Sequence, residues 1–180
     1  MARIRFATVW MGGCSGCHMS FLDLDEWLME LAQHVDIVFS PLVDVKEYPE
    51  NVDAVLVEGA IANEEHVEMI RTVRDRTKIL IAFGDCAITG NVTALRNPLG
   101  VAEPVLTRSY VDNADVNPQI PYHPPILPPL VDRVQPLHAL VPVDLYLPGC
   151  PPPADRILAA IEPLLAGTVP HLTGRDIKFG

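Results

Sequence analysis

The chain has 180 residues, a mass of 19.7 kDa and a formal net charge of −10, from 13 basic and 23 acidic side chains. Because 49% of the residues are apolar, it can bury a substantial core, and we expect a single domain over residues 1–180. The acidic balance argues against a nucleic-acid-binding module, which needs a basic surface, and against binding to anionic membranes.

Strand-like and helical patterns alternate through the first half of the chain. Phe21, Leu24, Leu28 and Leu31 recur at spacings of three and four, which is typical of one apolar helix face. Asn63 is a plausible N-cap residue for a second helix. We predict strands at residues 3–11, 35–43, 52–60 and 78–83, and helices at residues 19–34 and 64–76.

Proline dominates the second half of the chain. Of the 18 prolines, fourteen lie between Pro98 and Pro153, so that stretch cannot be mostly helix or central strand. Residues 98–143 exceed an ordinary connection in length, and we expect them to form an extended insertion that binds a partner. A short strand at residues 144–147 and a helix at residues 153–167 follow.

Strands that alternate with helices predict an α/β fold with right-handed crossovers and a mostly parallel, doubly wound sheet. Five strands suggest the flavodoxin-like order 2-1-3-4-5, with the proline-rich insertion before the last strand. No internal repeat interrupts this pattern.

Four cysteines follow the ends of predicted strands. Cys14 and Cys17 come after the first strand, Cys86 after the fourth and Cys150 after the fifth, while Glu58 ends the third. Parallel strands have their carboxyl ends at one edge of the sheet, where ligands bind in such folds. We therefore expect all four thiols to meet at one site, near the carboxylate.

Four thiolates at one site need a cation, and several cations remain open. Structural zinc sites usually combine two short cysteine pairs, whereas only the first pair here is close in sequence. Widely separated cysteines suit a [4Fe–4S] cluster better, because each of its four irons takes one thiolate. Unliganded thiols are the remaining alternative. The N-terminus shows no pattern of a signal peptide, and no apolar run is long enough to span a bilayer, so we expect a cytoplasmic protein.

Four segments carry a resemblance to a known family: WMGGCSGCHMSFLD, EGAI, FGDCAITGN and LPGCPPP. They resemble the motifs of the small subunit of nickel–iron hydrogenases and, more distantly, those of the cluster-bearing subunit of respiratory complex I. The C-x-x-C spacing and the CHMSFLD extension look most like the short small subunit of the soluble NAD-reducing hydrogenase. The resemblance implies that Cys14, Cys17, Cys86 and Cys150 bind the proximal [4Fe–4S] cluster.

The resemblance also implies partners. A large subunit would carry the nickel–iron site, and diaphorase subunits with flavin and iron–sulfur groups would bind NAD. The chain contains no G-x-G-x-x-G fingerprint, so we do not expect it to bind the nicotinamide itself. A flavin in the same crevice is conceivable, but it is not part of the prediction. Two alternatives are a subunit of an energy-converting membrane hydrogenase or complex I-like enzyme and, more remotely, a zinc-stabilised interaction protein.

Two polar residues near the cysteines have open roles. Glu58 is either a solvated carboxylate at a strand end, a proton relay, or a residue of the partner interface. His18 directly follows a cysteine and is interpreted first as an ordinary residue at the start of a helix, with donation to sulfur or proton shuttling as the alternative.

Overall fold

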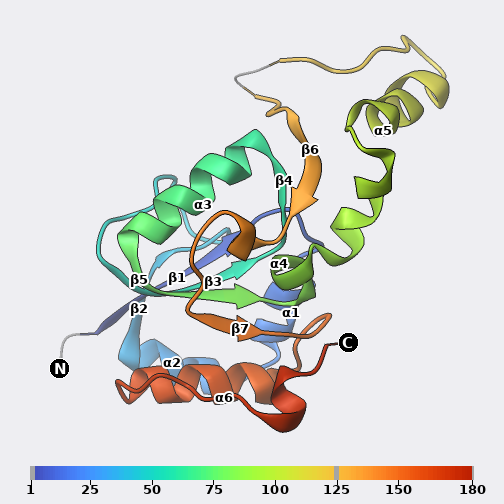
Figure 1. Ribbon diagram of the computed structural model, residues 1–180. Coiled ribbons are helices and arrows are strands. Elements are labelled where there is room, and N and C mark those ends of the chain that lie inside the picture. Colours follow the sequence, from blue (N-terminus) through green and yellow to red (C-terminus); the bar gives the residue numbers. More distant parts are fainter. Residues whose placement is uncertain (1–2, 124–125, 180) are drawn as a thin grey trace.

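A five-stranded parallel sheet lies at the centre of the computed structural model, which describes residues 3–123 and 126–179 (Figure 1). Neighbouring strands pair in parallel throughout, and their spatial order is β2-β1-β3-β5-β7. The strands are β1 (Ile4–Trp10), β2 (Val35–Phe39), β3 (Val52–Glu58), β5 (Thr77–Phe83) and β7 (Leu145–Leu147). The predicted α/β fold and its 2-1-3-4-5 order are confirmed.

Helices cover both faces of the sheet (Figure 1). On one face lies α3, whose Ile70 and Val73 are fully buried in the same core cluster as Val57 and Leu80. The central strands are almost wholly apolar because both of their faces are covered. The helices are α1 (Gly16–Leu22), α2 (Trp27–His34) and α6 (Ala154–Leu165) on one face, and α3 (Glu64–Arg76) on the other. Within the described ranges, no helix is long and apolar enough to cross a membrane.

The helix predicted at residues 19–34 is two helices in the structure. The first, α1, starts at Gly16 and ends at Leu22, and α2 begins at Trp27. Asp25 between them has a φ of 48°, a left-handed conformation that aspartate tolerates better than most residues. Short acidic side chains also favour turns over helix interiors, so the apolar spacing continues across a real break. The strand predicted to reach residue 43 is shorter in the structure, since β2 ends at Phe39.

The proline-rich stretch is not uniformly extended. It contains α5 (Glu103–Thr107), a π-helical turn η2 (Arg108–Asp112) and the strand β6 (Leu130–Gln135), which pairs antiparallel with β4 (Ile61–Asn63). A 3-10 turn η3 (Leu137–Ala139) then returns the chain to the sheet. Val134, Leu137 and Val141 are buried, so this end of the insertion belongs to the chain's own core.

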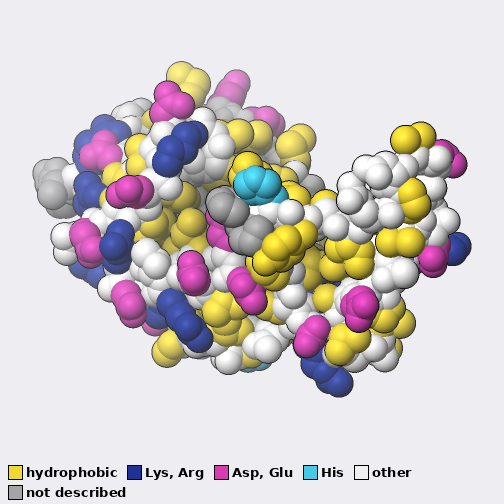
Figure 2. Space-filling model, turned by 90° about the horizontal axis from the view of Figure 1, so that it is seen from above, with side chains coloured by type: hydrophobic (Ala, Val, Ile, Leu, Met, Phe, Trp, Pro, Cys, Tyr) yellow, Lys and Arg dark blue, Asp and Glu magenta, His cyan; other side chains and the backbone are white. Residues whose placement is uncertain are grey.

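A projecting arm, residues 100–123, lies outside that core except for the buried Ala102. It contains α5 and η2 and stands away from the sheet (Figure 1). Tyr110, Val116 and Tyr122 are exposed, and Figure 2 shows several separate apolar side chains on the part of the surface that projects to the right. The arm begins after η1 (Asn91–Leu99), whose Arg96 and Asn97 hold β6 through its backbone carbonyls.

Candidate metal centre

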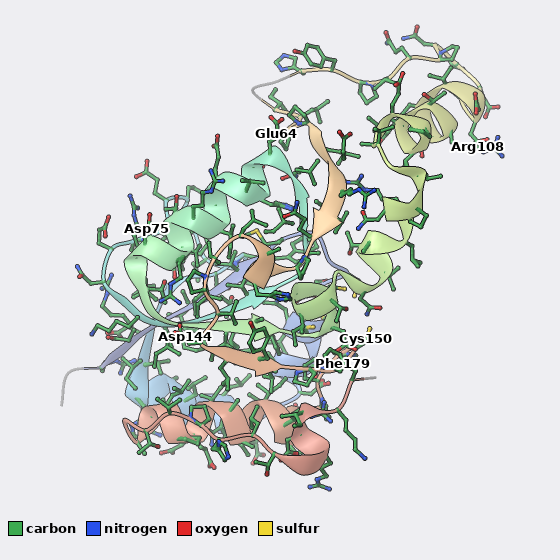
Figure 3. The ribbon with its side chains drawn as sticks, in the orientation of Figure 1. Glu64, Asp75, Arg108, Asp144, Cys150 and Phe179 are labelled. Atoms are coloured by element: carbon green, nitrogen blue, oxygen red, sulfur yellow. The ribbon has the colours of Figure 1, made fainter. Side chains whose placement is uncertain are left out.

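The structure places all four cysteines beyond the carboxyl ends of the parallel strands. Cys14 lies in the loop after β1 and Cys17 lies in α1; Cys86 lies in the short helix α4 (Asp85–Thr89) after β5. Cys150 follows β7, at the opposite end of that strand from Asp144 (Figure 3). Cys17 is buried, Cys86 is half-buried, and Cys14 and Cys150 are exposed, so the thiols run from the core to the surface.

Hydrogen bonds tie the loop of Cys86 to the loop of Cys150. The Gly84 N–H donates to the Leu147 carbonyl at 2.9 Å, and the Asp85 N–H donates to the Gly149 carbonyl at 2.9 Å. In return, the Gly149 N–H donates to Asp85 Oδ1 at 2.7 Å. The carboxylate is buried, so this reciprocal pairing fixes the separation of the two loops. Sequence reasoning missed Asp85, although its place directly before a cysteine in FGDC was a signal.

Two glycines allow the cysteine sulfur atoms to come close to the main chain. A Cβ on Gly84 would lie 2.2 Å from Cys17 Sγ, and the φ of this residue is 85°. A Cβ on Gly16 would lie 3.2 Å from Cys14 Sγ, to which the Gly16 N–H donates at 3.4 Å. Glycine is therefore required at Gly84 both by its conformation and by the adjacent thiol.

The four thiols influence one another electrostatically. Burial raises the pKa of Cys17 far above its ordinary value, and the charges of Glu58, Cys86, Cys14 and Cys150 raise it further. Burial also raises the pKa of Cys86, although a hydrogen bond with the Thr93 side chain opposes that rise. Burial and the neighbouring charges therefore oppose the thiolate forms of Cys17 and Cys86, and a bound cation would offset both effects.

The four cysteines belong to segments that meet at one edge of the sheet. Within residues 3–123 and 126–179, no group of three or more His, Cys, Asp or Glu side chains forms a ready metal site. Structural zinc sites usually combine two short cysteine pairs, whereas only Cys14 and Cys17 are close in sequence here.

Glu58 lies beneath the first cysteine loop, where it is 1% exposed. Its Oε2 accepts the backbone N–H of His18 at 2.9 Å and pairs with the Nδ1 of the same residue. His18 is the third residue of α1, so Glu58 satisfies one of the free N–H groups at the start of that helix. The solvated alternative for Glu58 is wrong, because the carboxylate is enclosed and holds the helix that carries Cys17.

Comparison with known proteins connects this arrangement to a family. A family model described as "NADH ubiquinone oxidoreductase, 20 Kd subunit" matches residues 14–164. The chain is 38% identical to the NAD-reducing hydrogenase HoxS subunit delta of Cupriavidus necator, over 92% of this chain and 80% of that protein. It is 39% identical to a subunit of the F420-non-reducing hydrogenase vhu of Methanocaldococcus jannaschii, over 94% of this chain but only 58% of the relative.

Solved structures show the same likeness. A crystal structure of an NAD+-reducing [NiFe]-hydrogenase in the H2-reduced state matches with a TM-score of 0.92 and 40% identity, over 99% of this chain and 100% of the matched chain. A [NiFeSe]-hydrogenase of Dm. baculatum matches with a TM-score of 0.61 and 19% identity, over 98% of this chain and 69% of that one, which indicates a shared fold.

Proposed function

The chain belongs to the family of the 20 kDa subunit of NADH ubiquinone oxidoreductase and of hydrogenase small subunits, and we propose that it is the electron-transfer subunit of an NAD-reducing nickel–iron hydrogenase. The predicted resemblance to hydrogenase small subunits is confirmed. The observation that carries the NAD-reducing assignment is the similarity in structure to an NAD+-reducing hydrogenase over nearly the whole chain. In this proposal the protein works in the cytoplasm, where thiols remain reduced.

The donor set supports a [4Fe–4S] cluster as the group that this chain holds. Cys14, Cys17, Cys86 and Cys150 supply one thiolate for each of four irons. Only Cys14 and Cys17 are close in sequence, whereas structural zinc sites usually combine two short cysteine pairs, so the spacing favours ligands on separate irons. Gly84 provides the close approach of the main chain that Cys17 needs. When bound, the cluster supplies one-electron transfer between the enzyme's redox sites.

Partners follow from the same proposal. A large subunit would carry the nickel–iron site, and diaphorase subunits would transfer electrons to NAD. Within residues 98–143, we propose that a partner subunit binds the exposed part, which is the arm. The segment around Leu137 is already buried within this chain. The exposed apolar side chains of the arm, including Tyr110 and Tyr122, are the kind of surface that a partner subunit covers.

Whether NAD is the electron acceptor can be tested directly. The F420-non-reducing relative is as similar in sequence as the NAD-reducing one, so sequence identity does not decide whether the acceptor is NAD. The assembled enzyme should reduce NAD with hydrogen. The preparation must retain every subunit that co-purifies. If it oxidises hydrogen with an artificial dye but not with NAD, the acceptor is a molecule other than NAD.

Metal analysis tests the cluster itself. The enzyme, purified without oxygen through a tag on this chain, should yield a chain that contains about four irons and little zinc after the subunits are separated anaerobically. Cys86→Ser should lower that iron content, because a serine oxygen is a poorer ligand for the cluster. Thr89→Ser in the same helix α4 is the matched control and should retain it. Stoichiometric zinc with little iron in the wild-type chain would contradict the proposal.

A further inference from the structure

The turn that joins α4 to η1 lies next to Cys150. Gly90 has a φ of 82° and Asn91 a φ of 37°, so the chain reverses through two successive left-handed residues. The Asn91 N–H donates to Thr89 Oγ1 at 3.2 Å, which holds the turn against the end of α4. Asparagine is one of the few residues besides glycine that adopt this conformation readily. Its side chain is thereby directed by a fixed backbone.

Asn91 of this turn and Thr93 of η1 lie near thiols that follow different strands. Asn91 Nδ2 donates to Cys150 Sγ at 3.4 Å. A hydrogen bond with the Thr93 side chain opposes the rise that burial causes in the pKa of Cys86. Thr93 is the third residue of η1, and its Oγ1 donates to the carbonyl of Gly12, two residues before Cys14, at 3.0 Å. Asn91 and Thr93 therefore connect the segments that follow β1, β5 and β7, although neither is a ligand.

We propose that Asn91 and Thr93 are hydrogen-bond donors to the ligand thiolates of Cys150 and Cys86 and that they raise the reduction potential of the bound cluster. The proposal rests on the proposed function, since it needs a cluster at this site. A donor to a thiolate withdraws electron density from sulfur and stabilises the reduced state, which carries the greater negative charge. Asn91 and Thr93 act through the ligands, so they are positioning and tuning residues.

The chemistry of each side chain fits this role. The Asn91 amide does not ionise, so its N–H groups can donate to sulfur in either redox state of the cluster. The Thr93 hydroxyl has a single hydrogen, which it donates to the Gly12 carbonyl in this structure. When Cys86 becomes a thiolate it is the stronger acceptor, and we expect the hydroxyl to turn toward it.

The test is a redox titration of the assembled enzyme, followed by electron paramagnetic resonance. The signal that disappears in Cys86→Ser identifies the cluster of this chain. The informative variants are Asn91→Gly, which removes the amide but suits the left-handed backbone, and Thr93→Val, which replaces the hydroxyl with a methyl group. Asn97→Ala is the matched control, because Asn97 lies on the same helix η1 and bonds to the backbone of Val134 instead of to sulfur.

Each informative variant should shift the midpoint potential to a more negative value. At the potential where the wild-type cluster is half reduced, we expect the ratio of reduced to oxidised cluster to fall about threefold or more, as for the loss of one hydrogen bond. Thr93→Ser should restore the wild-type value, and Asn97→Ala should leave the potential unchanged. Iron content is measured in every preparation.

Unchanged potentials in Asn91→Gly and Thr93→Val, at full iron content, would overturn the inference and leave the proposed function standing. If Asn91→Gly instead loses iron, then Asn91→Gln decides. Retention of iron by Asn91→Gln supports a donor at this position, and loss of iron from both variants overturns it. A wild-type chain without iron would refute the proposed function first, so the two failures are distinguishable.

Discussion

Replacement of Gly84 with alanine should prevent the metal centre from loading while most of the fold survives. A Cβ at this position would lie 2.2 Å from Cys17 Sγ, whereas contacts below 3.0 Å essentially do not occur. Cys17 would therefore have to retreat by at least 0.8 Å, the difference between these two distances. Ligand atoms of a metal site tolerate deviations of only about 0.2 Å from ideal bond lengths.

The thiol has little freedom to make that movement. Cys17 is 7% exposed and packs in the same core cluster as Phe21 and Phe83, so its side chain cannot simply swing into solvent. Alanine at a φ of 85° and a ψ of 164°, a region that glycine alone adopts freely, also costs about 1–3 kcal/mol of backbone strain. That cost alone is smaller than the roughly 5–15 kcal/mol typical of the stability of a domain. The loss of iron should therefore exceed the loss of folded protein.

Gly100→Ala provides the control. Gly100 also has a positive φ, 83°, although its ψ is −40° where that of Gly84 is 164°, and a Cβ there would have no atom within 4 Å. Gly100→Ala therefore places an alanine at positive φ without the clash. Iron per chain and the visible absorbance of the anaerobically purified enzyme are the measurements. Full iron content in Gly84→Ala would refute the argument, and equal iron loss in both variants would attribute the effect to strain alone.

Three further predictions concern the carboxylate, the insertion and pH. Glu58→Ala should leave the His18 backbone N–H unpaired and weaken protection of α1 against hydrogen exchange by about 1–3 kcal/mol. Glu58→Gln should keep the cluster; lost hydrogen turnover in that variant would support a proton relay, and unchanged turnover would contradict it. The exposed part of residues 98–143 should gain exchange protection when the enzyme assembles, and equal protection in the isolated chain would exclude docking there. Burial lowers the pKa of His66, so its imidazole binds a proton more readily in the unfolded chain than in the folded one. The free energy of unfolding should therefore decrease as pH falls below about 6.5. Thermal melts of His66→Gln should lose this pH dependence, whereas melts of a variant of the exposed His34 should keep it.

Much of the fold was predictable because it follows from local patterns. The apolar runs that became β3 and β5 are continuous over most of their lengths, as strands covered on both faces must be. The helix predicted at residues 64–76 is α3 (Glu64–Arg76), and its predicted cap, Asn63, accepts the His66 N–H at 2.8 Å. Once the strands are parallel, their carboxyl ends share an edge, so the placement of the four cysteines there also followed from sequence.

The supporting contacts of the site were not predictable in the same way. Glu58 and His18 are 40 residues apart, and Asn91 and Cys150 are 59 apart. No periodicity links such positions, because their meeting depends on the register of neighbouring strands and on the direction of each loop. The sequence marked Glu58 as interesting, but only the structure showed that it is enclosed and engaged within its own chain.

The sequence by itself thus determined the five strands of the parallel sheet, the helix α3 and the edge of the sheet that receives the thiols. The tertiary structure alone decided that the helix breaks at Asp25, that β6 pairs with β4, and that Asn91 donates to Cys150. The physical reason is the range of the interactions. Periodic burial and capping act over a few residues, whereas these contacts form only when separate elements have already packed against one another.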